Sequence, residues 1–235
     1  MMKLKNLAAY IHPAGWPFIG LFAVAAVALG LFGLVPFFFG IVLFAWCIYF
    51  FRDPARVTPA RPGLVISPAD GRVIAISEVV PDPDLGLGDQ KRTRISIFLN
   101  VFDVHVNRSP VDGKIVHAHY RPGKFVNASL DKASVDNERM ALALQMSGQH
   151  PYDGQLLGVV QIAGLIARRI ICTVQKGYVL QAGERFGIIR FGSRADIYLP
   201  QGLHPLVCIG QRMIAGETVL ADCLGTEAAR KGEVR

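Results

Sequence analysis

The hydrophobic and polar positions divide the chain into an apolar first fifth and a mixed remainder. Residues Gly15 to Phe51 include no charged side chain. As one helix at 1.5 Å per residue this stretch would be roughly 55 Å long, far longer than a bilayer core of ~30 Å requires. Gly30, Gly33 and Pro36 interrupt it near the middle. The pattern therefore predicts a transmembrane hairpin of two short helices, at about 16–33 and 36–51.

The residues that flank the predicted hairpin indicate its orientation. Lys3 and Lys5 precede it, and three arginines follow it at positions 52, 56 and 61. Because basic residues collect on the cytoplasmic side, we expect both ends of the hairpin to lie there, at the inner cell membrane. A cleaved signal peptide is the alternative interpretation, but no small-residue cleavage site precedes a polar stretch.

Three segments follow from this pattern. Residues 1–51 form the membrane anchor, in which Trp16, Trp46 and Tyr49 suit the membrane interface. Residues 52–63 contain three prolines and predict a stiff, extended connector that keeps the next domain near the bilayer. Residues 64–235 form that domain, which we expect to face the cytoplasm.

Residues 64–235 contain short apolar runs separated by Gly, Pro and Asp turns, with little helical periodicity. This pattern predicts a mainly β domain. The runs are 72–80, 94–106, 114–120, 140–146, 156–162, 170–174, 178–180, 186–191, 195–199, 206–209 and 218–221. The polar stretch 127–138 predicts a long loop.

Two internal repeats refine the prediction for this domain. Ser67-Pro68-Ala69-Asp70-Gly71 is echoed by Ser109-Pro110-Val111-Asp112-Gly113, and Ala182-Gly183-Glu184 is echoed by Ala215-Gly216-Glu217. Each repeat has the composition of a turn beside a strand. Paired turns of this kind predict a compact, pseudo-symmetric β sandwich or barrel-like domain.

Charge and cysteine content restrict the partners. The chain has a formal net charge of +7, and its basic residues are scattered with no nucleic-acid recognition motif. An anionic phospholipid surface therefore suits this charge better than nucleic acid does. The four cysteines form no pair or framework that would indicate a metal site or disulfides, which agrees with a reducing compartment.

Several residues are candidates for chemistry. The Gly192-Ser193 pair lies between two predicted strands, where a base could activate the serine hydroxyl against the preceding carbonyl. Asp70 and Asp112 have the composition of turn aspartates. His105 lies at a predicted strand end and could transfer protons near neutral pH. His117 and His119 form an H-x-H pair, which is a weak metal signal, and we expect no metal.

Taken together, several motifs in order closely resemble those of the short bacterial and archaeal phosphatidylserine decarboxylases. The resemblance covers nearly the whole chain. The motifs are the apolar hairpin, Phe51-Arg52-Asp53-Pro54, Ser67-Pro68-Ala69-Asp70-Gly71, Asp103-Val104-His105-Val106-Asn107-Arg108, Asn137-Glu138-Arg139, Gln161-Ile162-Ala163-Gly164 and Phe191-Gly192-Ser193.

This resemblance implies a proenzyme that cleaves itself between Gly192 and Ser193. The two resulting chains are 1–192 and 193–235, and Ser193 becomes a covalent pyruvoyl cofactor. That group forms a Schiff base with the serine amine of phosphatidylserine and accepts electrons as carbon dioxide leaves, giving phosphatidylethanolamine. By the same resemblance, Asp70 is the processing aspartate and His105 acts in decarboxylation.

One departure from the family pattern concerns the base for self-cleavage. Longer family members carry a second histidine three residues after the first, whereas this chain has Arg108, which cannot act as a base at ordinary pH. Either His105 serves both steps or another histidine such as His119 replaces it.

Candidate substrate-binding residues are Arg108, His119, Lys132, Arg168 and Arg169. The sequence does not distinguish a monomer from a homodimer, or diacyl from archaeal ether lipid substrates.

Two other functions also fit parts of the sequence. A membrane-tethered zinc peptidase would use His117, His119 and an aspartate. A non-enzymatic carrier-like β domain would explain the paired Ala-Gly-Glu turns, although the chain has no evident carrier lysine at a hairpin tip.

Overall fold

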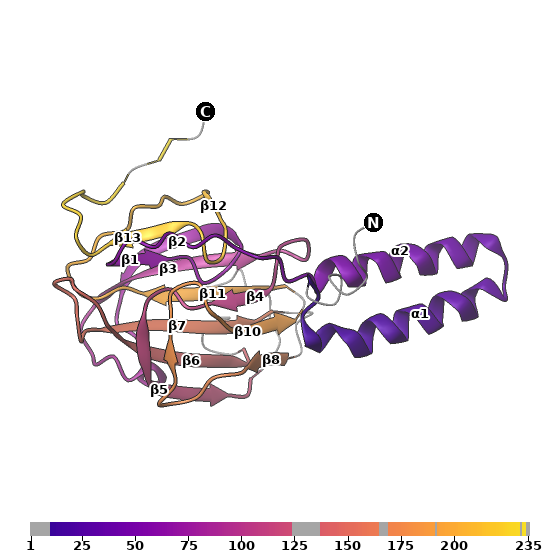
Figure 1. Cartoon of the computed structure of the whole chain (residues 1–235), viewed down its shortest axis with the longest axis horizontal. Coiled ribbons are helices and arrows are strands. Elements are labelled where there is room, and N and C mark those ends of the chain that lie inside the picture. The colour runs from indigo at the N-terminus through magenta and orange to yellow at the C-terminus, as the bar shows by residue number, and fades with distance from the viewer. Residues whose placement is uncertain (1–9, 124–136, 165–168, 191, 231, 234–235) are drawn as a thin grey trace. The chain divides into compact units, whose positions relative to one another are not determined.

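The computed structural model describes residues 10–123, 137–164, 169–190, 192–230 and 232–233 (Figure 1). Two compact units are present in it. One contains residues up to Ala55 together with Phe102–Val104, and the other contains Arg56–Val101 and His105 onward. The expected long loop at 127–138 lies outside the described residues except for its last two positions.

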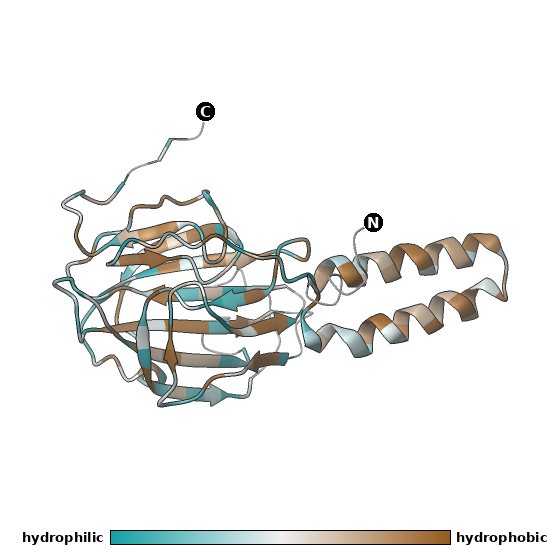
Figure 2. Ribbon diagram, viewed as in Figure 1, coloured by the Kyte–Doolittle hydropathy of each residue, from teal (hydrophilic) through white to brown (hydrophobic). Residues whose placement is uncertain are grey.

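The first unit is a helical hairpin. The short 3-10 helix η3 (Pro13–Gly15) leads into α1 (Trp16–Gly30), and α2 (Leu34–Phe50) follows a turn at 31–33. Gly33 makes this turn with φ +123°, a conformation that favours glycine. Figure 2 shows both helices dominated by apolar residues. The stretch Pro13–Gly30 is long and apolar enough to cross a membrane, whereas α2 is apolar but shorter.

Small residues allow the two helices to pack closely. A Cβ atom on Gly40 would lie 2.6 Å from the Cα of Ala26, so α1 and α2 approach each other here with almost no side chain between them. Many of the large apolar side chains on the other helix faces are exposed, including Leu21, Val27 and Phe38. Such exposure is expected of helices surrounded by lipid.

The second unit is built from antiparallel strands, which confirms the mainly β prediction. Its largest sheet has eight strands in the order β12-β2-β3-β11-β7-β6-β5-β9, and a three-stranded sheet has the order β4-β10-β8. The strands are β1 (Leu64–Ile66), β2 (Gly71–Val79), β3 (Arg92–Leu99), β4 (Val106–Arg108), β5 (Gly113–Arg121), β6 (Arg139–Met146), β7 (Leu156–Ala163), β8 (Arg169–Cys172), β9 (Val179–Leu180), β10 (Arg185–Arg190), β11 (Ser193–Tyr198), β12 (Arg212–Met213) and β13 (Val219–Asp222).

The eight-stranded sheet has a distinct apolar cluster on each face. On its inner face, side chains such as Ala195 and Ile197 pack with Ile170 of β8 and Ile189 of β10 in the main core. On its outer face, Ala141 and Val160 pack under Leu85 of the 3-10 helix η4 (Pro83–Leu85). Because side chains alternate along a strand, each residue of β11 can be assigned to one of these faces.

The sequence repeats correspond to a pseudo-twofold arrangement. In the strand order, β12-β2-β3-β11 mirrors β9-β5-β6-β7, so β11 and β7 lie side by side at the centre (Figure 1). Ser67 and Ser109 each donate a side-chain hydrogen bond of 2.8 Å to the carbonyl two residues later. The equivalent backbone bonds Gly216 N to Ser67 O and Gly183 N to Ser109 O are both 2.8 Å. The paired Ala-Gly-Glu turns thus brace the paired aspartate turns.

Two strand predictions were wrong. The run 94–106 is not one strand, because β3 ends at Leu99 and β4 begins at Val106. Phe102 is 60% exposed between them, so its hydrophobicity does not mark a core strand. The run 206–209 is not a strand either. Leu206 N bonds Leu220 O at 2.7 Å, but the segment forms no ladder.

Candidate active site

Ser193 begins β11 at the centre of the large sheet. It pairs with Leu99 of β3 on one side and with Ala163 of β7 on the other, and it is completely buried. Its side chain lies on the inner face, which it shares with Ala195 and Ile197. Within the described residues, Ser193 Oγ has no hydrogen-bond partner. A buried hydroxyl without a partner costs free energy, and the hydroxyl of Ser96 on β3 shares this property.

Gly192 connects this serine to β10 with φ +65°, in the left-handed region. A Cβ atom would meet nothing within 4 Å, so the backbone conformation, rather than space, favours glycine. The Gly192 N–H donates a hydrogen bond of 3.3 Å to His105 Nε2. The structure therefore brings the predicted residues Gly192, Ser193 and His105 together.

His105 is completely buried in the segment that leads into β4. Its carbonyl accepts a 3.2 Å hydrogen bond from Ile189 N of β10, which fixes the backbone beside the strand that precedes Gly192. Because Nε2 accepts from Gly192, this contact assigns the ring as neutral with its proton on Nδ1. A neutral imidazole held against Gly192 can take up a proton there.

Asp70 and Asp112 occupy equivalent turns, so their surroundings can be compared directly. Asp70 Oδ1 accepts from Ala215 N at 2.8 Å, and Asp112 Oδ1 accepts from Ala182 N at 2.7 Å. Asp70 also forms an ion pair of 2.8 Å with Arg56, whose Nη2 contacts both carboxylate oxygens. Asp112 forms no ion pair in the described part of the chain. Both aspartates accept a backbone hydrogen bond, whereas the partly buried ion pair distinguishes Asp70.

Asp70 forms no hydrogen bond with Ser193 Oγ, which has no partner within the described residues. The register Arg72–Phe98–Arg194 places β3 between β2 and β11, so the Asp70 turn and Ser193 lie about 10 Å apart along the sheet, two strand spacings. Any effect of Asp70 on the serine must therefore pass through an intervening group or a rearrangement.

Asn107 links the pieces of this region, and the motif-based site prediction did not include it. Its Nδ2 donates to Pro68 O of the Asp70 turn at 3.2 Å, and its Oδ1 accepts from Gln161 Nε2 of β7 at 2.8 Å. The side chains of Asn107 and Gln161 are completely buried, and the third group is the backbone carbonyl of Pro68. Gln161 could have been found from the sequence, because it is a polar residue in an apolar strand.

Arg108 lies among the paired turns. It is 6% exposed, and its Nη1 donates to Gly183 O at 3.0 Å. A Cβ atom on Gly216 would lie 2.8 Å from Arg108 Cδ and 3.5 Å from Arg56 Cβ, so both arginines border this glycine. These contacts place the Arg108 guanidinium beside Gly183.

His119 lies far from Gly192. The lateral register His119–Ala141–Val160–Asp196 places it three strand spacings from β11, or about 14 Å, and on the outer face. Its Nδ1 is 3.5 Å from Asp84, and its side chain is 47% exposed. His117 stacks near it, with ring centroids 6.4 Å apart. No group of three metal-ligating side chains occurs among the described residues.

A cavity of about 610 Å³ lies near the serine. Its polar side is formed by Tyr120, Glu138 and Arg169, and its apolar side by Met140, Ile170, Cys172 and Val174. Glu138 O accepts from Ala163 N at 2.9 Å, and Ala163 pairs with Ser193, so Glu138 lies about two strand spacings, roughly 10 Å, from the serine.

Charged groups are concentrated at this cavity. Glu138 Oε1 accepts from Ile170 N and Tyr120 Oη, each at 3.1 Å. Burial raises the pKa of Tyr120, and the Glu138 carboxylate adds to the increase. Arg169 pairs in register with Arg190, two residues before Gly192. Burial and the charge of Arg169 both lower the pKa of Arg190. Lys132 and Arg168 lie outside the described residues.

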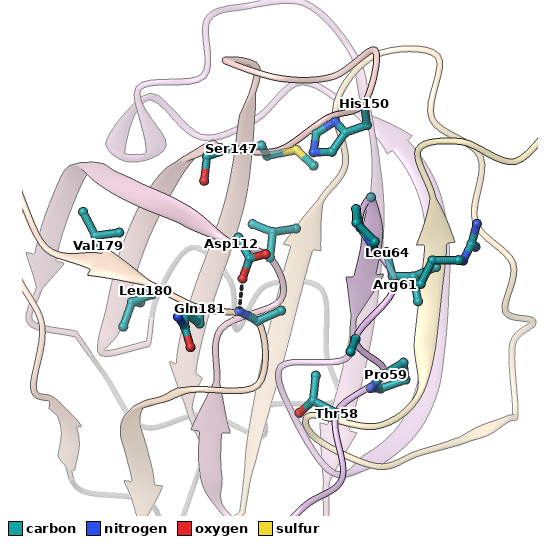
Figure 3. Close-up of a pocket in the computed structure, with 16 residues that line it drawn as sticks. Thr58, Pro59, Arg61, Leu64, Asp112, Ser147, His150, Val179, Leu180 and Gln181 are labelled. Atoms are coloured by element: carbon teal, nitrogen blue, oxygen red, sulfur yellow. Dashed lines mark hydrogen bonds between the residues drawn. The ribbon is translucent and has the colours of Figure 1, made fainter.

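Figure 3 shows a second cavity, of about 520 Å³, between the connector and several turns. Its labelled residues include Arg61, Asp112, His150 and Gln181. The neighbouring end of β6, Met146, lies about 24 Å along the strand from Arg139, which is near the Ser193 end. This cavity contains none of the predicted site residues, so we place the candidate site by the geometry around Gly192.

The arrangement defines a class of chemistry. A buried hydroxyl follows a glycine whose amide is held by an imidazole, which is suitable for a chain that reacts with its own backbone. A family model described as phosphatidylserine decarboxylase matches residues 43–221. The chain therefore belongs to the phosphatidylserine decarboxylase family, as the motifs predicted.

Individual relatives agree with this family. The chain is 57% identical over 225 residues to the phosphatidylserine decarboxylase proenzyme of Paramagnetospirillum magneticum, covering 96% of this chain and 92% of the relative. It is 53% identical over 237 residues to the proenzyme of the same description from Cereibacter sphaeroides, with complete coverage of both chains. The proenzyme from Ruegeria pomeroyi is 58% identical over 212 residues, covering 90% of this chain and 94% of that relative.

Proposed function

We propose that this chain is the proenzyme of a pyruvoyl-dependent phosphatidylserine decarboxylase that produces phosphatidylethanolamine. One observation carries the proposal. Among the described residues, the buried Ser193 hydroxyl has no hydrogen-bond partner. It directly follows Gly192, which has a left-handed backbone conformation and donates its N–H to His105. Family membership and the proenzyme description of the relatives support the same function.

Self-cleavage begins with attack of Ser193 Oγ on the Gly192 carbonyl carbon. The acyl group moves from nitrogen to oxygen, and the Ser193 nitrogen becomes a free amine. Loss of the Ser193 α-proton then expels Gly192 as a carboxylate and leaves dehydroalanine, which water converts to a pyruvoyl group with release of ammonia. His105 is the proposed proton acceptor because its ring contacts Gly192.

The surroundings of Ser193 fit such a group. Leu99 and Ala163 flank it on paired strands and are fully buried, so the group would be held in place by both neighbouring strands of the sheet. A pyruvoyl group at this position would supply an electron sink for the decarboxylation of an amine-bearing substrate. His105 then holds the proton that is returned to the substrate α-carbon.

The cavity at Glu138 and Arg169 is the proposed site of the lipid headgroup. Arg169 would bind an anionic oxygen of the substrate, and the apolar side would accept less polar atoms. Lys132 and Arg168 remain candidates by sequence. The contacts of Arg108 and His119 favour structural roles, at Gly183 and at Asp84 respectively.

The proposed location is the inner membrane, with the β unit on the cytoplasmic side. Support comes from the apolar stretch Pro13–Gly30 and from the basic residues on both sides of the hairpin. The net charge of +7 suits an anionic phospholipid surface.

Intact-mass analysis of the purified protein tests the proposal. The wild type should give two chains, with residues 193–235 at about 4.7 kDa carrying a pyruvoyl end, and it should release carbon dioxide from serine-labelled lipid. Ser193→Ala should stay whole and inactive. A wild-type protein that decarboxylates normally as one uncleaved chain would exclude the pyruvoyl mechanism.

A further inference from the structure

The segment Phe102–Val104 belongs to a different compact unit from the strands on either side of it. In sequence it lies between β3 and β4, yet it belongs to the same compact unit as the helical hairpin. Asp103 and Val104 are buried, whereas the Phe102 side chain is 60% exposed. This segment therefore presents one large aromatic side chain on the surface of the hairpin unit.

Arg52 fastens the segment to the end of α2. Its Nη1 donates to Tyr49 O and its Nη2 donates to Phe102 O, each at 2.7 Å. The guanidinium also lies 3.7 Å from the centroid of the Tyr49 ring. A cation that binds a carbonyl in the last turn of a helix is favoured by the helix dipole, and its stacking on tyrosine adds a cation–π interaction.

Besides Phe32, Phe38 and Phe39, which lie nearer the turn of the hairpin, three exposed aromatic residues of this unit lie toward its base. Trp16 at the start of α1 is 45% exposed, Tyr49 near the end of α2 is 46% exposed, and Tyr10 is 49% exposed. Asp53 N donates to Tyr10 O at 2.6 Å, which ties Tyr10 to the same end of the hairpin. Aromatic residues at the base of apolar helices are typical of the membrane–water interface.

We propose that Phe102–Val104 is a membrane-contacting segment whose partner is the boundary between headgroups and acyl chains of a phospholipid bilayer. Its continuity with the apolar hairpin, fixed by Arg52, selects a bilayer as the partner. The next residue in the chain is His105, whose ring bonds Gly192. Contact of this segment with lipid would help the enzyme to engage substrate in a bilayer, a consequence that rests on the proposed function.

Fluorescence quenching tests the contact without any need for activity. The full chain carries Phe102→Cys with an environment-sensitive label, in a Cys172→Ser background because the other three cysteines are buried. Val179→Cys is the matched control, since Val179 is 69% exposed on β9. Vesicles of phosphatidylcholine and phosphatidylglycerol contain no substrate. We expect nitroxide lipids to quench the label at position 102 severalfold more than at 179, and equal quenching at both positions would overturn the proposal.

Kinetics test the consequence for catalysis. Losing a phenylalanine from the bilayer surface should raise the apparent KM of Phe102→Ser for vesicle phosphatidylserine about tenfold, with a smaller effect on kcat. Phe102→Trp should restore the wild-type KM, and Val179→Ser should not change it. An unchanged KM for Phe102→Ser would also overturn the proposal. A wild type that releases no carbon dioxide would instead refute the proposed function, whereas the quenching result would stand.

Discussion

At the scale of single residues, a comparison of two aspartates in equivalent turns can separate structural from chemical roles. Asp70 and Asp112 make the same backbone hydrogen bond, but the contact with Arg56 belongs to Asp70. Because the two turns are equivalent, Asp112 provides a control for Asp70 within the same chain. A substitution at Asp112 measures what the turn requires, and the additional effect at Asp70 measures what the charge does.

Asp70→Asn should slow self-cleavage by about 10²-fold or more, whereas Asp112→Asn should cleave at nearly the wild-type rate. Asparagine keeps an acceptor for Ala215 N but removes the charge opposite the partly buried Arg56. The rate of appearance of the small chain on denaturing gels is the measurement.

An unpaired Arg56 could by itself destabilise Asp70→Asn, so a second variant is required. Asp70→Asn combined with Arg56→Gln removes both charges and should recover thermal stability without recovering cleavage. If the double variant cleaves at the wild-type rate, Asp70 has only a structural role.

His105→Ala should lower carbon dioxide release by about 10²-fold in whatever fraction has cleaved, because the proposed proton donor is lost. His117→Ala is the control, since His117 lies on the outer face near His119. Turnover of cleaved His105→Ala within a few-fold of wild type would assign proton transfer to another residue.

At the scale of elements, the helices and most strands could be predicted, because uncharged length and turn composition are local signals. The break at residues 100–105 could not, since Phe102 and Val104 extend an apolar run although only Val104 is buried. The site itself depends on the pairing of β11 with β3 and β7, which are distant in sequence. The motifs identified Gly192, Ser193 and His105, but Arg56 and Asn107 acquire their contacts only through this pairing of distant segments.

The contact between the two helices gives a prediction for the hairpin. Gly40→Leu should destabilise it by about 1–3 kcal/mol, because the new side chain would collide with Ala26. Gly20→Leu is a matched control on α1, since a Cβ atom there meets nothing within 4 Å. The midpoint of unfolding by SDS in mixed micelles is the measurement. Equal midpoints for the two variants would show that the helices do not pack through Gly40.

At the scale of the whole molecule, the position of the proposed cleavage site determines where the two proposed chains lie in the fold. Residues 193–235 contribute β11 to the centre of the large sheet, β12 to its edge beside β2, and β13 as the partner of β1. Their core side chains include Ala195, Ile197, Leu199, Val207, Met213 and Leu220. The small chain is therefore an internal part of the β unit.

We expect the two chains to remain together after cleavage. Burial of about six apolar side chains at roughly 1.5–3 kcal/mol each contributes on the order of 10 kcal/mol before ordering costs, and leaving would also expose both edges of β11. Gel filtration of the cleaved protein in mild detergent at nanomolar concentration is the measurement, with a denaturant-treated sample as control. Both chains should elute together without denaturant and separate with it. Loss of the small chain on dilution alone would mean that β11 is held far more weakly than its central position in the sheet requires.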